Sequence, residues 1–550
     1  MAARWSVGSK LYLIVLLIFW EFPDAYAQTP VQQFWLQNQS VDSLIWDNTA
    51  GNGVIDNGSG TWDTTSLNWL HSQIGFGTVN DNWPGASKRK CRPAIFGGNP
   101  GVGNAGTVTL AYPIANVMSI NFKPVPGGNF TITGQSIQSC APRLNLFTAP
   151  NVSATIASSI TGAPALIKSG TGTLILTGAN TYTGTTTVAT GTLQVGNNGT
   201  TGTLGTGSVT NNDSLMYYRS DAIAVPASIS GAGNLILQTA GNINPSNGSA
   251  ITQSSITANG TQFSLTNTNW KAPVINANGN YLPLNGTITI DATGGAANFT
   301  FNNTGNYAIA SGNGTTLNTF GNVTLTGNMT AGNGIYGGIG FGNTLKNTGG
   351  LLKLVATSIG RVAYEAGVTG SYATGINIVG NVEIDGMAGV FIGNYHDIAS
   401  AGQVLGNGTL TLVGNRYGFN LQSNVLDNGG PFAVIFRTTD AANGTIVVSG
   451  TIGVGALTFD VAGGTSTLNG LIRNGTFNVC TITKAGAGTV QLGGANTYTG
   501  GTTINAGTLT AGSINAFGTG TITVNAGGTL NKNGFAITNT VVNNGGTVIP

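Results

Sequence analysis

Hydrophobic and polar residues alternate in three short runs within residues 166–195, and turns rich in Gly, Asn and Thr separate the runs. The runs are Thr173–Leu176 (TLIL), Thr186–Val188 (TTV) and Gly191–Leu193 (GTL). A period of two residues is typical of a β-strand that buries one face. Three short strands, joined by turns that change the chain direction, predict one coil of a β-solenoid. Such a coil cannot bury its apolar face alone and must stack on neighbouring coils.

The same pattern returns near the other end of the chain, in residues 482–511, with seventeen of thirty positions identical. The identical positions include the whole run Gly178–Gly184 (GANTYTG), which occurs again as Gly494–Gly500. We therefore expect Tyr182 and Tyr498 to take equivalent places at a corner of their coils. Four leucines are expected to point into the solenoid: Leu176, Leu193, Leu492 and Leu509.

These two units resemble the autotransporter-associated β-strand repeat, which is found in passenger regions of bacterial surface proteins. The resemblance lies in the Lys-x-Gly-x-Gly-Thr opening, the Gly-Ala-Asn-Thr-Tyr-Thr-Gly centre and the Gly-Thr-Leu close. Looser echoes occur in residues 230–238, 405–413 and 530–543. The resemblance implies a right-handed parallel β-helix that is displayed outside the cell. It implies a scaffold and no particular reaction.

Composition favours the same fold. Charged residues make up 7% of the chain, against about 25% in ordinary globular proteins, and 87 of the 550 residues are Gly. A hydrophobic content of 40% is too high for a disordered chain. Asn residues at stacked corners are expected to form side-chain amide ladders along the solenoid. The net charge of +2 does not favour a nucleic-acid partner, and no helical periodicity follows residue 27, so the mature chain is predicted to be all-β.

The N-terminal residues 1–27 have the pattern of a signal peptide. Arg4 and Lys10 supply a positive region, residues 11–20 (LYLIVLLIFW) are apolar, and residues 25–27 (AYA) form a cleavage site. The alternative is a membrane anchor, but ten apolar residues are too few to span a bilayer as a helix. The sequence therefore predicts export, with cleavage after residue 27.

Residues 28–110 differ from the rest because they are rich in tryptophan. Their segment GSGTWDTTSLNWL (residues 58–70) resembles the opening of secreted proteins that carry this repeat. The first coil of a solenoid has no preceding neighbour, so we predict an N-terminal cap here, followed by the β-helix repeat region over residues 111–550. The alternative is a carbohydrate platform, since aromatic faces stack on sugars. The tryptophans of this segment are Trp35, Trp46, Trp62, Trp69 and Trp83.

Three cysteines do not form a disulfide framework. Cys91 and Cys140 either pair, which would tie the cap to the first coils, or remain separate thiols. Cys480 lies in a strand-like run (FNVCTIT) and is expected to pack inside as a small apolar residue. The basic run at residues 88–92 is either a solvated loop or a contact for an anionic glycan or lipopolysaccharide.

Weak candidates for catalysis lie between residues 361 and 397. Glu383 and Asp385 alternate in the run VEID, so both are expected on one face of a strand. Glu365 precedes Asp385 by about one coil length of 20 residues, so the two are expected to stack on adjacent coils. Other ionisable groups lie nearby: Arg361, His396 and Asp397. The simpler interpretation is that these carboxylates are only the exposed positions of an alternating strand.

No motif of a serine hydrolase, a zinc protease, a P-loop or a calcium-binding nonapeptide repeat occurs in the sequence. We therefore predict no enzymatic activity, no cofactor and no metal. The main hypothesis is an exported structural or adhesive rod whose partners are cell-surface glycans or other cells. The alternative is a polysaccharide lyase or hydrolase with a carboxylate groove near residues 361–397, where Glu365, Glu383 and Asp385 would converge with Arg361.

The resemblance also implies a place in the cell and a secretion partner. Passengers of this kind reach the surface of bacteria that have an outer membrane, with the help of an outer-membrane translocator. The repeat-like pattern runs to residue 550, and no translocator pattern follows it. The translocator is therefore expected in trans or outside this chain, and the localisation is predicted to be extracellular or at the cell surface.

Overall fold

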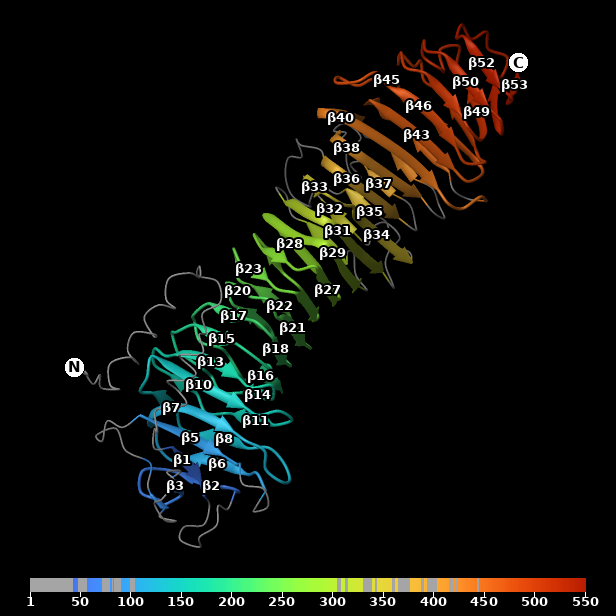
Figure 1. Ribbon diagram of the computed structural model, residues 1–550. Coiled ribbons are helices and arrows are strands. Elements are labelled where there is room, and N and C mark those ends of the chain that lie inside the picture. The colour runs from blue at the N-terminus through green and yellow to red at the C-terminus, as the bar shows by residue number, and fades with distance from the viewer. Residues whose placement is uncertain are drawn as a thin grey trace, which may run out of the picture.

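The computed structural model is an elongated rod of stacked β-coils, with β1 (Leu44–Trp46) near one end and β53 (Thr547–Ile549) at the other (Figure 1). Within the part of the chain that the structure describes, every regular element is a strand, and successive coils pair almost entirely in parallel. The predicted all-β solenoid is therefore confirmed. The described residues are 43–47, 57–71, 80–81, 83, 91–98, 104–303, 308–311, 315–329, 339–341, 344–358, 362–364, 376–386, 390–392, 403–414, 419–421, 424–442 and 445–550.

Each coil passes through up to three short strands, so the rod has three sides, which we call side one, side two and side three. On each side a strand pairs with the strand one coil before it and with the strand one coil after it. Side one contains β5 (Arg92–Phe96), β7 (Ile114–Phe122), β10 (Arg143–Thr148), β13 (Ala165–Ser169), β15 (Thr186–Val188), β17 (Val209–Asn211), β20 (Ser228–Ser230), β23 (Ala250–Thr252), β26 (Asn269–Lys271), β33 (Thr344–Thr348), β42 (Ile452–Val454) and β45 (Ile472–Asn474).

Side two follows side one in every coil. It contains β2 (Gly60–Trp62), β6 (Thr107–Leu110), β8 (Thr131–Gly134), β11 (Ser153–Ile156), β14 (Thr173–Leu176), β16 (Thr192–Gly199), β18 (Ser214–Arg219), β21 (Asn234–Thr239), β24 (Ser255–Asn259), β27 (Val274–Gly279), β34 (Leu352–Ser358), β43 (Ala456–Val461), β46 (Thr481–Ala485), β48 (Thr502–Ile504), β50 (Ile522–Asn525) and β52 (Val541–Asn544). Five long strands bend from side one onto side two and belong to both: β29 (Thr287–Asn303), β31 (Thr316–Met329), β36 (Ile376–Gly386), β38 (Gln403–Gly414) and β40 (Asn424–Thr438).

Side three closes the coil. It contains β9 (Ile137–Ser139), β12 (Ile160–Thr161), β19 (Ile223–Val225), β22 (Ile243–Pro245), β25 (Leu265–Thr266), β28 (Leu282–Asn285), β30 (Ile309–Ser311), β32 (Ile339–Phe341), β35 (Val362–Tyr364), β37 (Val390–Ile392), β39 (Phe419–Leu421), β41 (Ile446–Val448), β44 (Thr465–Leu468), β47 (Thr489–Leu492), β49 (Gly507–Ala511), β51 (Gly528–Asn531) and β53.

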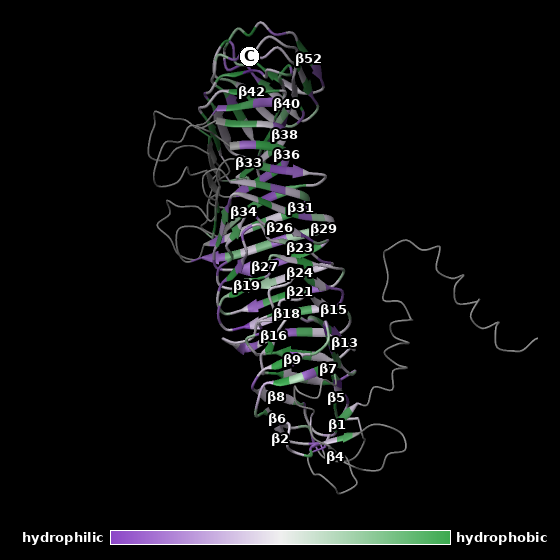
Figure 2. Cartoon of the chain, turned by 90° about the vertical axis from the view of Figure 1, so that its left-hand side faces the viewer, coloured by the Kyte–Doolittle hydropathy of each residue, from purple (hydrophilic) through white to green (hydrophobic). Residues whose placement is uncertain are grey.

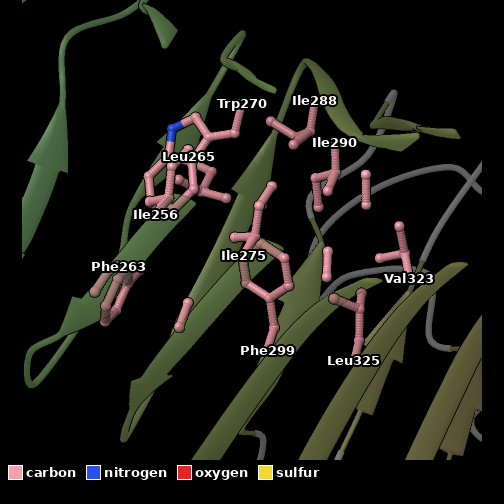
Figure 3. Close-up of a cluster of buried hydrophobic side chains, with 14 of the residues drawn as sticks. Ile256, Phe263, Leu265, Trp270, Ile275, Ile288, Ile290, Phe299, Val323 and Leu325 are labelled. Carbon is pink, nitrogen blue, oxygen red and sulfur yellow. The ribbon is translucent and has the colours of Figure 1, made fainter. Parts of the chain in front are cut away.

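Most apolar residues of the three sides point inward and form one continuous core along the rod. The four leucines predicted to face inward are all completely buried, and alternate residues of their strands face outward. Figure 2 shows the resulting alternation of hydrophilic and hydrophobic segments along the strands. In the middle of the rod, Ile256, Leu265 and Trp270 converge from different strands (Figure 3). Full burial of each such side chain contributes roughly 1.5–3 kcal/mol, so stacking of coils is what stabilises the rod.

Coil length varies along the rod. In the first repeat Leu166 pairs with Thr186, which matches the predicted coil of about 20 residues. In the middle, Leu317 pairs with Leu345, and Leu345 pairs with Ile378, so the coils there are longer. The alternation of buried and exposed positions on the strands is the same in both parts, because the extra residues lie between strands.

The N-terminal end of the rod holds a cluster of aromatic rings. Trp46, Trp62, Trp69 and Trp83 are at most 1% exposed, and Trp62 lies 4.9 Å from Trp69, centroid to centroid. Here β3 (Trp69–His71) pairs antiparallel with β1 and with β4 (Asn80–Asp81), which departs from the parallel stacking elsewhere. Buried ring faces cannot stack on sugars, so these four tryptophans do not form a carbohydrate platform. Trp35 lies outside the described residues.

Parallel pairing already includes β5 and β6, so coil-like stacking begins before residue 111. The exact boundaries of the signal peptide (1–27), the cap (28–110) and the repeat region (111–550) stay predictions, and residues 1–27 lie outside the described ranges. No helix in the described ranges is long and apolar enough to cross a membrane.

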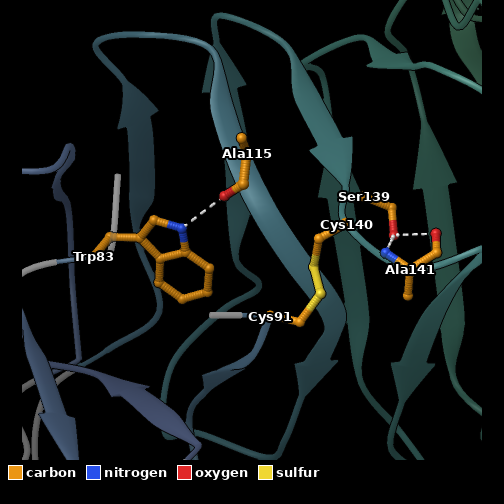
Figure 4. The surroundings of a disulfide bond; sticks show 6 residues. All are labelled: Trp83, Cys91, Ala115, Ser139, Cys140 and Ala141. Atoms are coloured by element: carbon orange, nitrogen blue, oxygen red, sulfur yellow. Dashed lines mark hydrogen bonds between the residues drawn. A yellow bond between two sulfur atoms is a disulfide. The ribbon is translucent and has the colours of Figure 1, made fainter. Parts of the chain in front are cut away.

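A disulfide joins Cys91, just before β5, to Cys140, just after β9, with their Cα atoms 5.8 Å apart (Figure 4). The bond therefore ties the aromatic end of the rod to a neighbouring coil, which resolves the open question of this pairing. Nearby, Trp83 Nε1 donates a hydrogen bond to the carbonyl of Ala115 at 3.0 Å. Cys480 is fully buried, and burial raises the pKa of its thiol to about 12, which confirms its predicted packing role.

Candidate functional site

The predicted carboxylates Glu383 and Asp385 lie on side two, in the second half of β36, and both are half-buried on its outer face. On the preceding coil, Lys353 of β34 stands in register with Glu383. Its ammonium nitrogen lies 2.7 Å from Glu383 Oε1 and 3.8 Å from Asp385 Oδ2. The sequence analysis missed this partner, although the alternating run LKLVA around Lys353 shows it as an outward position of a strand.

Burial raises the pKa of the Asp385 carboxyl, Lys353 opposes that rise, and the neighbouring Glu383 adds to it. On the following coil the same register positions hold Thr411 and Val413, so the carboxylates do not continue along the ladder. The arrangement is one lysine that pairs with two carboxylates on the outer face of the sheet.

The other residues of the predicted groove are not described by the structure, so their convergence stays a prediction. Glu365, Arg361, His396 and Asp397 lie outside the described residues. The expectation that Glu365 stacks against Asp385 therefore stays a prediction. The ladder neighbours of Asp385 are Val355 and Val413, whereas Tyr364 belongs to β35 on side three.

Two further ion pairs have the same form as Lys353–Glu383. Lys271 lies 3.0 Å from Asp291, and Arg437 lies 3.0 Å from Asp460, measured between side-chain nitrogen and oxygen. In both pairs the basic residue stands one coil before the acidic residue at the same register position. Pairing across neighbouring strands offsets the repulsion that stacked like charges would cause. In the described part of the chain no group of three or more His, Cys, Asp or Glu residues is placed to hold a metal ion.

A lysine, an asparagine and a tyrosine in each repeat unit have a different role, because they are buried. Lys168 is fully buried, and its ammonium donates to the carbonyls of Ser169, Gly170 and Thr190 at 3.0, 2.6 and 3.1 Å. The ammonium thus joins a corner to the corner of the next coil. Gly191 lies next to this contact and has a φ of 75°, which favours glycine. A Cβ at this position would also collide with the carbonyl oxygen of Gly170.

The second copy reproduces this lysine contact. Lys484 donates to the carbonyls of Ala485, Gly486 and Ala506 at 2.7, 2.8 and 3.1 Å. Burial lowers the pKa of both lysines to about 8, and a nearby carboxylate, Asp213 or Asp460, partly opposes this.

The asparagine of the GANTYTG run connects three coils. Asn180 Oδ1 accepts from the backbone N–H of Ile160 one coil before, and its amide nitrogen donates to the carbonyl of Thr203 one coil after, at 2.8 and 2.7 Å. Asn496 makes the equivalent bonds at 2.8 and 2.6 Å, to the N–H of Ile472 and the carbonyl of Ala516.

The tyrosines also occupy equivalent places, as predicted. Tyr182 and Tyr498 are fully buried, and each hydroxyl lies within hydrogen-bond distance of a threonine hydroxyl four residues later. The partners are Thr186 at 2.6 Å and Thr502 at 2.8 Å. Burial raises the pKa of both phenols.

The two copies nevertheless lie on different sides of the rod. In the first copy, β13 and β15 pair on side one, and β14 and β16 pair on side two. In the second copy, the equivalent strands β46 and β48 pair on side two, and β47 and β49 pair on side three. The second copy is therefore rotated by one side about the axis of the rod. The sequence carries no local signal for this rotation.

Comparison with known proteins agrees with this architecture. Residues 166–195 and 482–511 match the family model Passenger-associated-transport-repeat. The whole chain is similar to the Adhesin BmaC autotransporter of Brucella suis biovar 1 (strain 1330), with 28% identity over 590 aligned positions. This chain is autotransporter passenger-like. The similarity covers 97% of this chain but only 16% of the length of that relative. No solved structure matches this chain significantly.

Proposed function

We propose that this chain is an exported adhesive rod that binds cell-surface glycans or other cells through many weak contacts. One observation carries the proposal: the lysine, asparagine and tyrosine that both repeat units share make bonds inside the scaffold. Lys168, Asn180 and Tyr182 are all at most 5% exposed, as are their counterparts in the second copy. Binding of a partner would therefore use the long outer faces, where hydroxyl and amide side chains predominate.

The similarity to a protein described as an adhesin supports this proposal, as does the predicted signal peptide. The cell surface of a bacterium with an outer membrane, and a translocator outside this chain, are parts of the same proposal. Because each coil offers similar outward groups, affinity would arise from the number of contacts and would decline gradually as contacts are removed.

The proposal includes the absence of enzymatic activity. Glu383 and Asp385 are bound to the ammonium of Lys353 on an outer sheet face, an arrangement that suits structural charge pairing. A glycosidase needs two carboxylates placed on either side of a scissile bond, one of them free to act as an acid.

A binding series tests the adhesive function. Purified residues 28–550 would be bound to cells and to immobilised glycans, and compared with variants from which whole coils have been removed in register. We expect a graded loss of binding with each coil removed. An abrupt loss on changing residues 361–397 alone, with indifference to other deletions, would contradict the proposal.

The double variant Glu383→Ala and Asp385→Ala tests the alternative activity. We expect surface binding to stay within twofold of the parent, because half-exposed carboxylates contribute little to a multivalent contact. Glu383→Gln with Asp385→Asn is the matched control that keeps the side-chain shape. Polysaccharide cleavage by the parent chain that disappears in both double variants would establish an enzyme instead.

A further inference from the structure

Side two between β16 and β27 has three parallel stripes of outward side chains. They arise because each of these strands places alternate residues outward, and because the ladder pairs them without a shift along most of this stretch. Neighbouring strands in such a ladder are about 4.8 Å apart, so each stripe repeats its chemistry at that spacing along the rod.

The first stripe carries hydroxyl and amide groups as far as β24 and ends at the exposed Val274 of β27. Thr192 pairs with Ser214, Ser214 with Asn234, and Asn234 with Ser255, all at outward positions. Ser255 Oγ donates to Asn234 Oδ1 at 2.7 Å, so neighbouring members of the stripe hold each other in place.

The third stripe is a ladder of side-chain amides. Tyr218, Gln238, Asn259 and Asn278 follow one another in register. Asn259 Nδ2 donates to Gln238 Oε1, and Asn278 Nδ2 donates to Asn259 Oδ1, each at 3.1 Å. This amide ladder lies on the strands of side two, whereas the sequence predicts such ladders at the corners. Each amide has a second N–H and a second lone pair, which can serve a partner in solution.

Two of the five members of the middle stripe are apolar, and its last member is Asn276 of β27. Met216 of β18 pairs with Ile236 of β21, and both side chains are half-buried between the two polar stripes. Gln194 precedes Met216 on the coil before, and Thr257 follows Ile236 on the coil after.

The three stripes are also free of charge in the described strands. The charged residue of these strands is Arg219 at the end of β18, and its guanidinium is bound to Asp221 at the corner, 2.7 Å away. Further along the same side, charged groups return with Lys353, Glu383 and Asp385. An anionic ligand would therefore find no cationic partner on the striped face.

We propose that this striped face binds a neutral polysaccharide chain that lies along the axis of the rod. A pyranose ring presents apolar C–H groups on its flat face and hydroxyl groups at its edges. The C–H faces would lie on Met216 and Ile236, and the hydroxyls at the two edges would bond to the stripe of Ser214 and the stripe of Gln238. Such a ligand is chemically complementary to the apolar pair Met216 and Ile236, which has a polar, uncharged stripe on each side. The inference rests on the proposed adhesive function and specifies the face and the ligand class.

The test uses purified residues 28–550 with cellulose and chitin as neutral probes and polygalacturonate as an anionic probe. Met216→Glu with Ile236→Glu places charge on the middle stripe, and Asn259→Asp changes the amide ladder with little change of shape. Thr458→Glu, on β43 of the same side but outside the stripes, is the matched control. Hydrogen exchange of the core amides checks that every variant is folded.

We expect the parent chain to bind a neutral probe, with an affinity that changes less than twofold between low and high salt. The Met216/Ile236 variant should bind at least tenfold more weakly, Asn259→Asp several-fold more weakly, and Thr458→Glu unchanged. Unchanged binding by the Met216/Ile236 variant, or binding of polygalacturonate alone, would overturn the inference. The inference would also be overturned if sedimentation showed that the parent chain forms a dimer and that the Met216/Ile236 variant does not. If the parent chain binds cells but none of the neutral probes, the proposed adhesive function stands and the proposed ligand of the striped face is wrong. If the parent chain binds neither cells nor probes, the proposed adhesive function is wrong.

Discussion

The two repeat units make the same internal contacts on different sides of the rod. Lys168 and Lys484 each bind three carbonyls, and Asn180 and Asn496 each connect the coils before and after them. Yet the first copy begins on side one and the second on side two. The repeat is therefore a local set of bonds between adjacent coils. These bonds form in the same way whichever side of the rod the repeat lies on. A binding or catalytic motif would instead need to keep its place relative to one face.

The largest effect should come from placing a charge in the core of each copy. Leu176→Asp and Leu492→Asp would each bury an unpaired carboxylate and should cost several kcal/mol locally. Because a solenoid couples nearest neighbours, hydrogen exchange should increase in the altered coil and the adjacent coils only. Thr173→Asp, at an outward position next to Leu174, is the control and should cost less than about 0.5 kcal/mol. Protection lost along the whole rod, or a loss in only one copy, would show that the copies are not equivalent local units.

A smaller effect should follow from removing the bridging amide. Asn180→Ala and Asn496→Ala leave the buried N–H of Ile160 or Ile472 without its acceptor, which should cost about 1–3 kcal/mol. The two losses should agree within about 0.5 kcal/mol if the side of the rod is irrelevant. Local unfolding free energies from hydrogen exchange give the comparison. Asn276→Ala, an outward residue of β27, should have little effect. A similar loss at Asn276 would mean that the bridging position is not special.

The smallest effect concerns the buried lysines. Burial lowers the pKa of Lys168 and Lys484 from 10.5 to about 8, so between these values the unfolded chain binds more protons than the folded chain. The stability of both coils should therefore rise as the pH increases from about 8 to 10.5, and should not respond to these lysines below that range. Thermal unfolding at several pH values would show the rise, and Lys168→Met with Lys484→Met should abolish it. A fall in stability over this range in the parent, absent in the double variant, would contradict the assigned shift.

The middle of the rod shows what replaces the repeat bonds. There the coils are longer, and outward ion pairs such as Lys353–Glu383 connect neighbouring strands. Sequence analysis identified Glu383 and Asp385 as outward residues of one strand because alternation is a local property. It could not identify Lys353 as their partner, since that pairing depends on how many residues the intervening corners contain.

The burial of Leu176 and the equivalence of Tyr182 and Tyr498 were determined by the sequence itself, because strand alternation and turn residues act over a few positions. The tertiary structure decided the role of Lys168, whose three acceptors come from two coils. It also decided the Cys91–Cys140 bond and the side of the rod on which each repeat lies. These features depend on the sum of all preceding coil lengths and on contacts between coils, and no short segment of sequence contains that information.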